Sequence, residues 1–295
     1  MIQKHLTLYS QWRTLAELEP GKQILGDYTR WLTAEEVLSL SEHLAGQFLT
    51  LGIHPGDYVA LRADRNIAAI LALIALRAIG AIVMLIDPRI ESASFLADTP
   101  AEYPIRALVE ATSDWFYSVS TNEAEKHFHL LALPPVHFTP VSIEVDSPAF
   151  VVFIQESVGN RKTVVLSESN IIDNLNNTAS PELYYCIDDI VLGAQPMDQV
   201  LGLELICGVA MLCYAMYLPQ MTDVPSLLFA IEKEHITCIN GDSSLFLALC
   251  EQKDSYDISS LRIGFIFGGA VTELQLHSIE ETLKITLIPV RDRNK

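Results

Sequence analysis

The segment from Gln155 to Thr163 has the residue types of a phosphate-binding turn. It follows an apolar run and precedes a helix that we expect to begin at Ser167. Small residues let a turn point backbone N–H groups at phosphate oxygens, and a lysine adds a compact positive charge. Ser157, Gly159 and Lys162 are the residues suited to this chemistry.

Residue types alone leave other interpretations of this turn open. The GxxxxGK spacing of a Walker loop is absent, and a solvated polar turn would use the same residues. The five cysteines lie in apolar stretches and form neither a CxxC pair nor a spaced set with histidine. We therefore expect free thiols in a reducing compartment and no metal site, and we assign no catalytic residue from spacing.

The expected elements place the turn at the carboxyl end of a strand in an α/β sheet. Thr33 to Leu51 is the clearest helix, because its apolar residues share one face, Thr33 and Glu36 form a capping box, and Gly52 ends it. The next elements are a strand over Tyr58–Leu61, a helix over Asn66–Ile79 and a strand over Ala81–Ile86. This order is a βαβ unit, whose strands run parallel.

The second half of the chain continues the alternation. A strand from Ala149 to Ile154 precedes the polar turn, and a long apolar helix begins after Gln199. Further strands are expected at Ile190–Leu192, Ile236–Ile239, Ile263–Phe267 and Ile285–Val290, and helices at Leu227–Glu234, Ser244–Glu251 and Glu273–Leu283. The prediction is an α/β fold with mostly parallel, doubly wound sheets flanked by helices. Two α/β subdomains are expected, at residues 1–140 and 141–295.

The composition excludes several classes of partner. The chain has 295 residues, and its 37 acidic against 19 basic side chains give a formal charge of −18. Such a field repels nucleic-acid phosphates and anionic lipids. Two apolar runs approach membrane length, but Arg77 interrupts one and Glu204 the other, and no secretory signal precedes them. We expect a cytoplasmic protein with no membrane span.

Several motifs in order resemble the adenylate-forming superfamily of acyl-CoA synthetases, luciferases and peptide-synthetase adenylation domains. FIQESVGNRKTVVLSESNIIDN is similar to its phosphate loop, with Ser157, Gly159, Lys162, Ser167 and Asn170 in register. Similar landmarks upstream are LTAEEV from Leu32, GIHPGDYVAL from Gly52 and LRAIGAIVMLIDPR from Leu76. Downstream, PMDQVLG from Pro196 and the glycine turn Gly268–Gly269–Ala270 complete the series.

The resemblance implies a reaction and a set of ligands. In this superfamily, ATP and a carboxylate give an acyl-adenylate and pyrophosphate, and the acyl group passes to coenzyme A or to the phosphopantetheine thiol of a carrier protein. The resemblance assigns Ser157, Gly159 and Lys162 to the β and γ phosphates and Gln199 to the carboxylate pocket. It places Gly268, Gly269 and Ala270 beside the adenine, with Mg²⁺ accompanying the nucleotide.

The sequence departs from the superfamily pattern at positions that matter for this chemistry. Glu156 replaces a loop glycine and puts a negative charge beside the expected phosphates, and Val158 removes a hydroxyl. Glu168 and Gln199 stand where the pattern has histidines, and we expect an altered acyl pocket. Residues 287–293 do not match the Tyr-Gly-x-Thr-Glu motif, and the small domain that carries the catalytic lysine is expected to be absent.

Three interpretations follow from these departures. The first is a truncated, divergent ligase-like protein, a pseudoenzyme that is weakly active or inactive alone and binds a carrier protein or an intact ligase. The second is the nucleotide-binding half of a split ATP-dependent carboxylate ligase, completed by a partner chain. The third is a fragment whose exposed strand at Ile285–Val290 would pair with further strands.

Overall fold

The structure is a computed structural model, and it describes residues 6–157, 160–177, 185–267 and 271–290. Its helices are α1 (Leu8–Leu18), α2 (Ala34–Thr50), α3 (Ile67–Ala78), α4 (Ser92–Asp98), α5 (Glu168–Asn177), α7 (Val200–Leu212), α8 (Val224–Glu234), α9 (Ser243–Gln252) and α10 (Glu273–Leu283). Two single 3-10 turns lie at Leu130–Ala132 and Lys253–Ser255.

Local sequence signals set the boundaries of the first helices. Thr33 caps α2 with the expected capping box: its hydroxyl accepts from the N–H of Glu36 at 3.3 Å, and the Glu36 carboxylate accepts from the N–H of Thr33 at 2.8 Å. Asn66 caps α3 by accepting from the N–H of Ala69 at 2.8 Å. These two predicted helices are confirmed.

The first sheet has seven strands in the order β7-β6-β5-β3-β4-β8-β9. Its strands are β3 (Tyr58–Arg62), β4 (Ile82–Ile86), β5 (Ile105–Ala111), β6 (Phe116–Thr121), β7 (Glu125–His129), β8 (Pro148–Ser157) and β9 (Asn160–Ser167). The central β5-β3-β4-β8 strands are parallel, and antiparallel hairpins close both edges. The predicted βαβ unit forms its centre.

The second sheet also has seven strands, in the order β14-β13-β12-β10-β11-β1-β2. Its strands are β1 (Gln23–Asp27), β2 (Trp31–Thr33), β10 (Ile190–Leu192), β11 (Ala215–Leu218), β12 (Cys238–Gly241), β13 (Ile263–Phe267) and β14 (Thr286–Val290). All of its pairings are parallel except that of β1 with β2. The predicted α/β class with mostly parallel sheets is confirmed.

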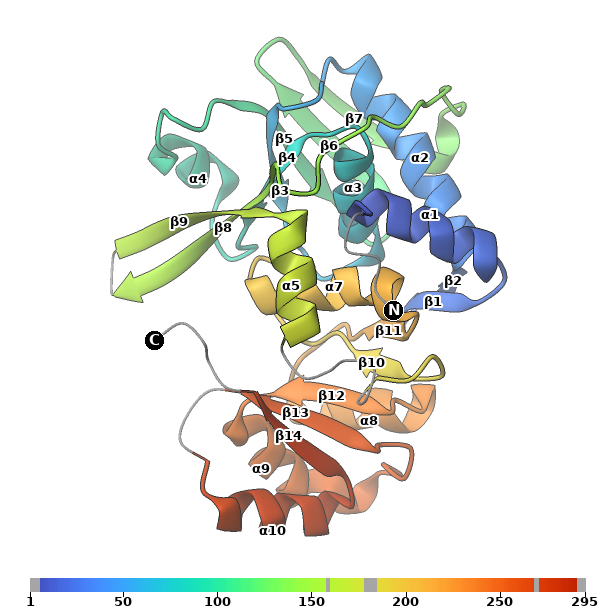
Figure 1. Cartoon of the computed structure of the whole chain (residues 1–295), viewed down its shortest axis with the longest axis vertical. Coiled ribbons are helices and arrows are strands. Elements are labelled where there is room, and N and C mark those ends of the chain that lie inside the picture. Colours follow the sequence, from blue (N-terminus) through green and yellow to red (C-terminus); the bar gives the residue numbers. More distant parts are fainter. Residues whose placement is uncertain (1–5, 158–159, 178–184, 268–270, 291–295) are drawn as a thin grey trace.

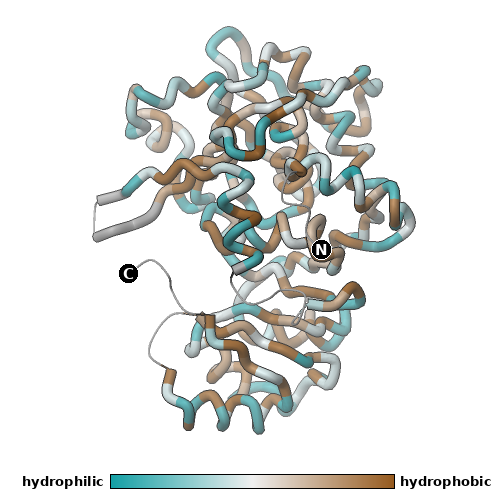
Figure 2. The backbone as a smooth tube through the Cα atoms, in the orientation of Figure 1, coloured by the Kyte–Doolittle hydropathy of each residue, from teal (hydrophilic) through white to brown (hydrophobic). Residues whose placement is uncertain are grey.

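Helices cover both faces of the second sheet (Figure 1). Every residue of α3 is buried, and the apolar side chains of α3 and α7 share one core with α1 and α2. A second core joins α8, α9 and α10 to the outer face of the second sheet, and a third joins Phe95 of α4 to the first sheet. Figure 2 shows the apolar segments along the strands and central helices and hydrophilic segments on the outer loops.

The N-terminal strands connect the two halves of the chain. β1 pairs with β11, so residues 23–33 belong to the sheet that is otherwise built from residues 190–290. The first sheet takes strands from residues 58–167. The predicted subdomain boundary between residues 140 and 141 stays a prediction. Among the described residues, no helix combines the length and apolarity needed to cross a membrane.

Candidate functional site

The segment predicted as a phosphate-binding turn is part of a β-hairpin. β8 continues to Ser157, and the chain returns as β9, with Ile154 opposite Lys162, before α5 begins at Glu168. The expectation of a polar turn running directly into a helix was wrong. The run Val164–Val165–Leu166 is a strand, because β-branched residues favour extended backbone and because β8 offers a full edge for pairing.

The hairpin projects past the carboxyl edge of the first sheet. β4 pairs with β8 through Val83–Phe150 and Met84–Val151, so its end at Ile86 is level with Phe153. The hairpin residues beyond that point therefore extend outward from the edge where parallel strands end (Figure 1). Parallel α/β sheets bind their ligands at this edge.

Only some of the predicted site residues are among those that the structure describes. Gly159, Gly268, Gly269 and Ala270 lie outside the described residues, and only the backbone of Ser157 is described, at the end of β8. Lys162 is exposed on β9. Gln199 is exposed at the start of α7, as the residue before its first turn.

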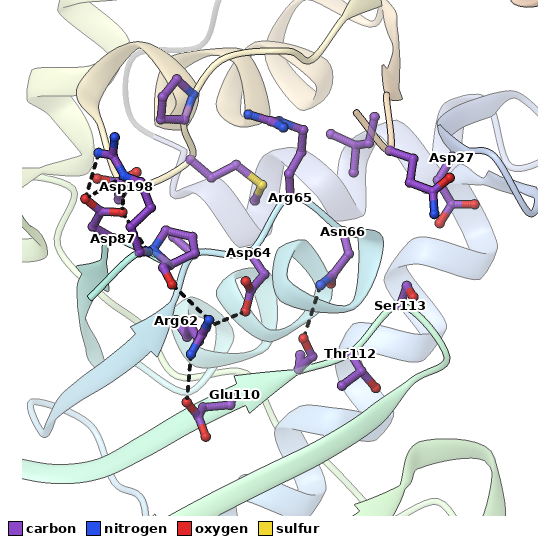
Figure 3. A pocket seen from close by; sticks show the side chains of 18 of the residues that line it. Asp27, Arg62, Asp64, Arg65, Asn66, Asp87, Glu110, Thr112, Ser113 and Asp198 are labelled. Carbon is purple, nitrogen blue, oxygen red and sulfur yellow. Dashed lines mark hydrogen bonds and ion pairs between the residues drawn. The ribbon is translucent and has the colours of Figure 1, made fainter. Parts of the chain in front are cut away.

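The largest pocket found among the described residues, called the largest pocket below, lies between the carboxyl edges of the two sheets (Figure 3). Its volume is about 890 Å³, and the ends of β1 and β11 face those of β3, β4 and β5 across it. Most of the side chains that line it are polar. Five are carboxylates and three are arginines: Asp27, Asp64, Asp87, Glu110 and Asp198, and Arg62, Arg65 and Arg89. Sequence reasoning did not assign this pocket, because its residues come from strands far apart in the chain.

Two of its three arginines are held in ion pairs. Arg62 contacts Asp64 at 3.0 Å and Glu110 at 3.6 Å, and it donates to the carbonyl of Pro88 at 2.9 Å. Burial nevertheless raises the pKa of Asp64, and the charge of Arg62 opposes that effect. These contacts brace the ends of β3, β4 and β5 against one another.

Arg89 forms the second pair, with Asp87. Its Nη2 lies 2.7 Å from Oδ2 of Asp87, and its Nε donates to Oδ1 of the same carboxylate at 2.8 Å. The contact is bidentate, which fixes the orientation of the two planar groups. The Arg89 side chain is 79% exposed, so this pair stands at the rim of the pocket.

Arg65 is different, because its guanidinium has no partner among the described residues. Its Nε is buried and has no hydrogen-bond partner. Burial lowers the pKa of Arg65, and no neighbouring charge of the described chain counters the effect. Figure 3 shows its side chain extending into the pocket, away from the Arg62 ion pairs.

A smaller pocket of about 390 Å³ shares a wall with the first. Gln199 lines it together with Asp87, Arg89 and Asp198, and apolar side chains from β4, β8 and α4 form the remainder. Burial, followed by the charge of Asp87, raises the pKa of Asp198. Lys162 lines neither pocket.

Most of the residues predicted to contact the nucleotide lie outside the described residues, so the described side chains do not by themselves place a triphosphate. Lys162 and Gln199, assigned to nucleotide and carboxylate, do not line a common pocket among the two described above. The pocket that Gln199 lines contains the ion pair of Asp87 with Arg89 and the further carboxylate of Asp198, whose negative charge would repel a phosphate chain. We therefore assign no adenylation step to these side chains. No group of three or more potential metal ligands occurs among the described residues.

Glu168, at a position where the resemblance has histidine, is buried in the interior. Its Oε1 accepts from Nε of Arg77 at 2.7 Å, and its Oε2 accepts from the N–H of Leu8 at 2.7 Å. Arg77 also donates to the carbonyl of Ala81 and lies over the ring of Phe150, 5.5 Å from its centroid. An arginine within an apolar helix is a sequence signal for such a partner, but the partner itself is 91 residues away.

The family model for AMP-binding enzymes matches residues 12–288, and this chain belongs to that family. A nonribosomal peptide synthetase, imqB of Aspergillus flavus, is 28% identical over 177 residues, which cover 56% of this chain and 5% of that protein. Bacitracin synthase 1 of Bacillus licheniformis is 22% identical over 236 residues, or 75% of this chain and 4% of that protein. The chain thus spans a small part of these curated relatives.

Solved structures share the fold at low identity. The N-terminal subdomain of Klebsiella oxytoca NpsA, in complex with 3-hydroxyanthranilyl-AMSN, superimposes with a TM-score of 0.80 at 16% identity, over 97% of this chain and 72% of that one. O-succinylbenzoate coenzyme A synthetase (MenE) from Bacillus subtilis, in complex with AMP, gives 0.77 at 17% identity, over 92% and 70%. These likenesses confirm the predicted fold of an N-terminal domain of an adenylate-forming enzyme.

Proposed function

We propose that this chain is a divergent member of the AMP-binding family that serves as a binding or assembly module, with weak or no adenylation on its own. The observation that carries the proposal is the burial of Glu168. At this position the resemblance has a histidine, and here the side chain is committed to Arg77 and to the N-terminus of α1. A residue held in this way supports the packing of three helices and is withdrawn from a ligand.

The charge of the carboxyl edge supports the same proposal. Five carboxylates and three guanidinium groups line the largest pocket, so acidic groups are in excess there. Glu156 adds a further negative residue to the hairpin sequence. A nucleotide triphosphate carries several negative charges, and its binding weakens in such a field, whereas a single anionic group that pairs directly with one guanidinium is affected less.

The ligands and partners of the proposed module follow from the family. Its members act on ATP or AMP, so Ser157, Gly159 and Lys162 are the proposed phosphate contacts, with Mg²⁺ as the accompanying ion. A small carboxylate and a thiol, either coenzyme A or a carrier-protein phosphopantetheine, are the proposed acyl donor and acceptor. A carrier protein or an intact ligase is the proposed macromolecular partner.

Calorimetric titration with MgATP tests the nucleotide assignment. We expect weak binding by the unaltered chain, and none by Lys162→Ala, because the variant loses the assigned phosphate contact. Lys233→Ala is the matched control, since Lys233 is 55% exposed and lies on α8. Pyrophosphate exchange with a panel of carboxylates then measures turnover. Robust exchange by the isolated chain would overturn the proposal of a binding module.

One observation favours a second candidate, the nucleotide-binding half of a split carboxylate ligase. β14 is the last strand of its sheet among the described residues and pairs only with β13, so its outer edge is open to another strand. This chain covers 72% of the NpsA subdomain that it resembles. Mixing it with the remaining segment of such a subdomain, together with a lysine-bearing C-terminal domain, should then restore pyrophosphate exchange. Exchange that stays absent from the mixture would count against this candidate.

A further inference from the structure

Arg65 has an unusual position among the charges of the largest pocket. Arg62 is held by Asp64 and Glu110, and Arg89 is held by Asp87. Arg65 follows β3 and immediately precedes Asn66, the capping residue of α3, so its backbone is fixed by two regular elements. Its guanidinium is thus a positioned positive charge with no compensating carboxylate among the described residues.

The buried Nε–H of Arg65, which has no acceptor among the described residues, costs the fold free energy. Burial removes this group from water and lowers the pKa of Arg65. A hydrophobic side chain at this position would avoid that cost. A destabilising polar group that faces a cavity is typical of a ligand site, where the ligand supplies the missing partner.

We propose that the largest pocket binds a small organic anion through Arg65, with a carboxylate or phosphate group of the ligand accepting from the guanidinium. The pocket volume of about 890 Å³ lies within the range of small-molecule sites. Tyr28 and Phe116, which are 47% and 41% exposed, also line it and offer apolar surface for the body of the ligand. A guanidinium matches both anionic groups because it donates two parallel hydrogen bonds.

The remaining carboxylates of the pocket leave this position available to an anion. Arg62 is shared by Asp64 and Glu110, so this group keeps one negative charge, whereas Arg89 compensates the charge of Asp87. Asp27 accepts from the N–H and hydroxyl of Thr29 and from the N–H of Arg30. Asp198, the fifth carboxylate, interacts with the charges of Asp87 and Arg89, and no carboxylate of the described residues affects the pKa of Arg65. The pocket therefore has local positive charge at Arg65 despite its overall excess of acidic groups. This site is separate from the hairpin and does not depend on the proposed function.

Calorimetric titrations of the full chain with benzoate and with phenyl phosphate test the proposal. We expect one of these probes to bind with 1:1 stoichiometry and Arg65→Gln to weaken the binding roughly tenfold or more, which corresponds to the loss of a charge-assisted hydrogen bond. Acetate and inorganic phosphate, which lack an apolar body, should bind more weakly. Binding of benzoate would show that the site prefers a carboxylate, and binding of phenyl phosphate would show that it prefers a phosphate.

Three variants distinguish binding at Arg65 from binding elsewhere on the chain. Arg13→Gln removes an exposed charge on α1 and should leave probe binding unchanged. Gln199→Ala alters the smaller pocket, to which the resemblance assigns a carboxylate, and reports whether the probe binds there instead. Arg65→Leu should lose the binding while its thermal midpoint without probe stays equal or rises. The proposal is overturned if neither probe binds, if Arg65→Gln binds as the unaltered chain does, or if Gln199→Ala and not Arg65→Gln abolishes binding.

Discussion

The Nε atom of Arg77 lies 2.7 Å from Oε1 of Glu168, and the two side chains are 1% and 3% exposed. The pair joins α3, which is entirely buried in the main hydrophobic core, to the start of α5, directly after the hairpin. The second carboxylate oxygen of Glu168 accepts from the N–H of Leu8. One buried side chain thus fixes α1, α3 and α5 relative to one another and sets the base of the hairpin.

Glu168→Ala should lower the free energy of unfolding by about 3–5 kcal/mol, because it leaves the charge of Arg77 buried without its partner. Urea unfolding followed by circular dichroism measures the change. The exposed pair Arg13–Glu17 provides the control, and Glu17→Ala should cost less than about 0.5 kcal/mol.

The double variant Arg77→Met, Glu168→Leu tests the cause of that loss. If the single variant is unstable because a charge is left unpaired, removing both charges should recover much of the stability. A double variant that is as unstable as Glu168→Ala would instead assign the loss to packing or to the Leu8 contact.

The pair of Asp189 and Arg262 should make stability depend on pH in the acid range. Burial tends to raise the pKa of Asp189, but hydrogen bonds from Arg262, Thr237 and the N–H of Cys186 lower it below its ordinary value. The unfolded chain then binds more protons, with an aspartate pKa of about 3.9. The contribution of Asp189 to the free energy of unfolding is fully present above the unfolded pKa, and it is lost as the pH falls toward the folded pKa.

The free energy of unfolding should therefore fall less steeply for Asp189→Asn than for the unaltered chain as the pH is lowered below about 5. Urea titrations at a series of acid pH values measure that slope. Asp254→Asn is the matched control, because Asp254 is 88% exposed and forms an ion pair with its chain neighbour Lys253. Equal slopes for Asp189→Asn and the unaltered chain would show that the aspartate does not link folding to protons.

Elements that depend on local signals could be predicted from the sequence. The capping residues Thr33 and Asn66 and the apolar run of α3 each act within a few residues, and the structure places these helices as expected. The alternation of strands and helices likewise indicates the class of the fold, because parallel strands need crossover helices. The motifs that carry the family resemblance are of the same local kind.

Features that depend on distant pairing could not be predicted. The sequence predicts a turn where β9 forms, since a short apolar run after a polar segment becomes a strand only when β8 extends beside it. The pairing of β1 with β11 and the Arg77–Glu168 contact join residues that no local pattern relates. The largest pocket could not be predicted for the same reason, because strands from both sheets contribute to it.

Glu204→Gln should stabilise the chain at neutral pH, by on the order of 1 kcal/mol. Burial raises the pKa of Glu204, and the hydrogen bond from Asn174 only partly opposes that effect. The folded state therefore binds more protons than the unfolded one, and stability falls as the pH rises through the window above the unfolded glutamate pKa of about 4.3. A glutamine keeps a hydrogen-bonding group without the charge.

The gain from Glu204→Gln should shrink as the pH is lowered toward about 4, where the carboxyl group is increasingly neutral in both states. Thermal midpoints at several pH values measure it, and Glu251→Gln, an exposed change at the end of α9, is the control. A gain that is the same at every pH would point to a packing effect of the amide.

Glu156→Gly should strengthen the binding of MgATP several-fold if the hairpin sequence is a nucleotide loop. The substitution removes a negative charge from the segment that contains Lys162, and like charges a few ångströms apart repel by about 1 kcal/mol when both are solvated. Calorimetry on Glu156→Gly and on Glu125→Gly, a change of the same type in β7 at the opposite edge of the first sheet, separates the local charge from the net charge of the chain. Equal gains in both variants would mean that the overall charge of −18, and not the loop, limits the affinity for nucleotide. A gain confined to Glu156→Gly, and abolished by adding Lys162→Ala, would place the phosphates at the hairpin.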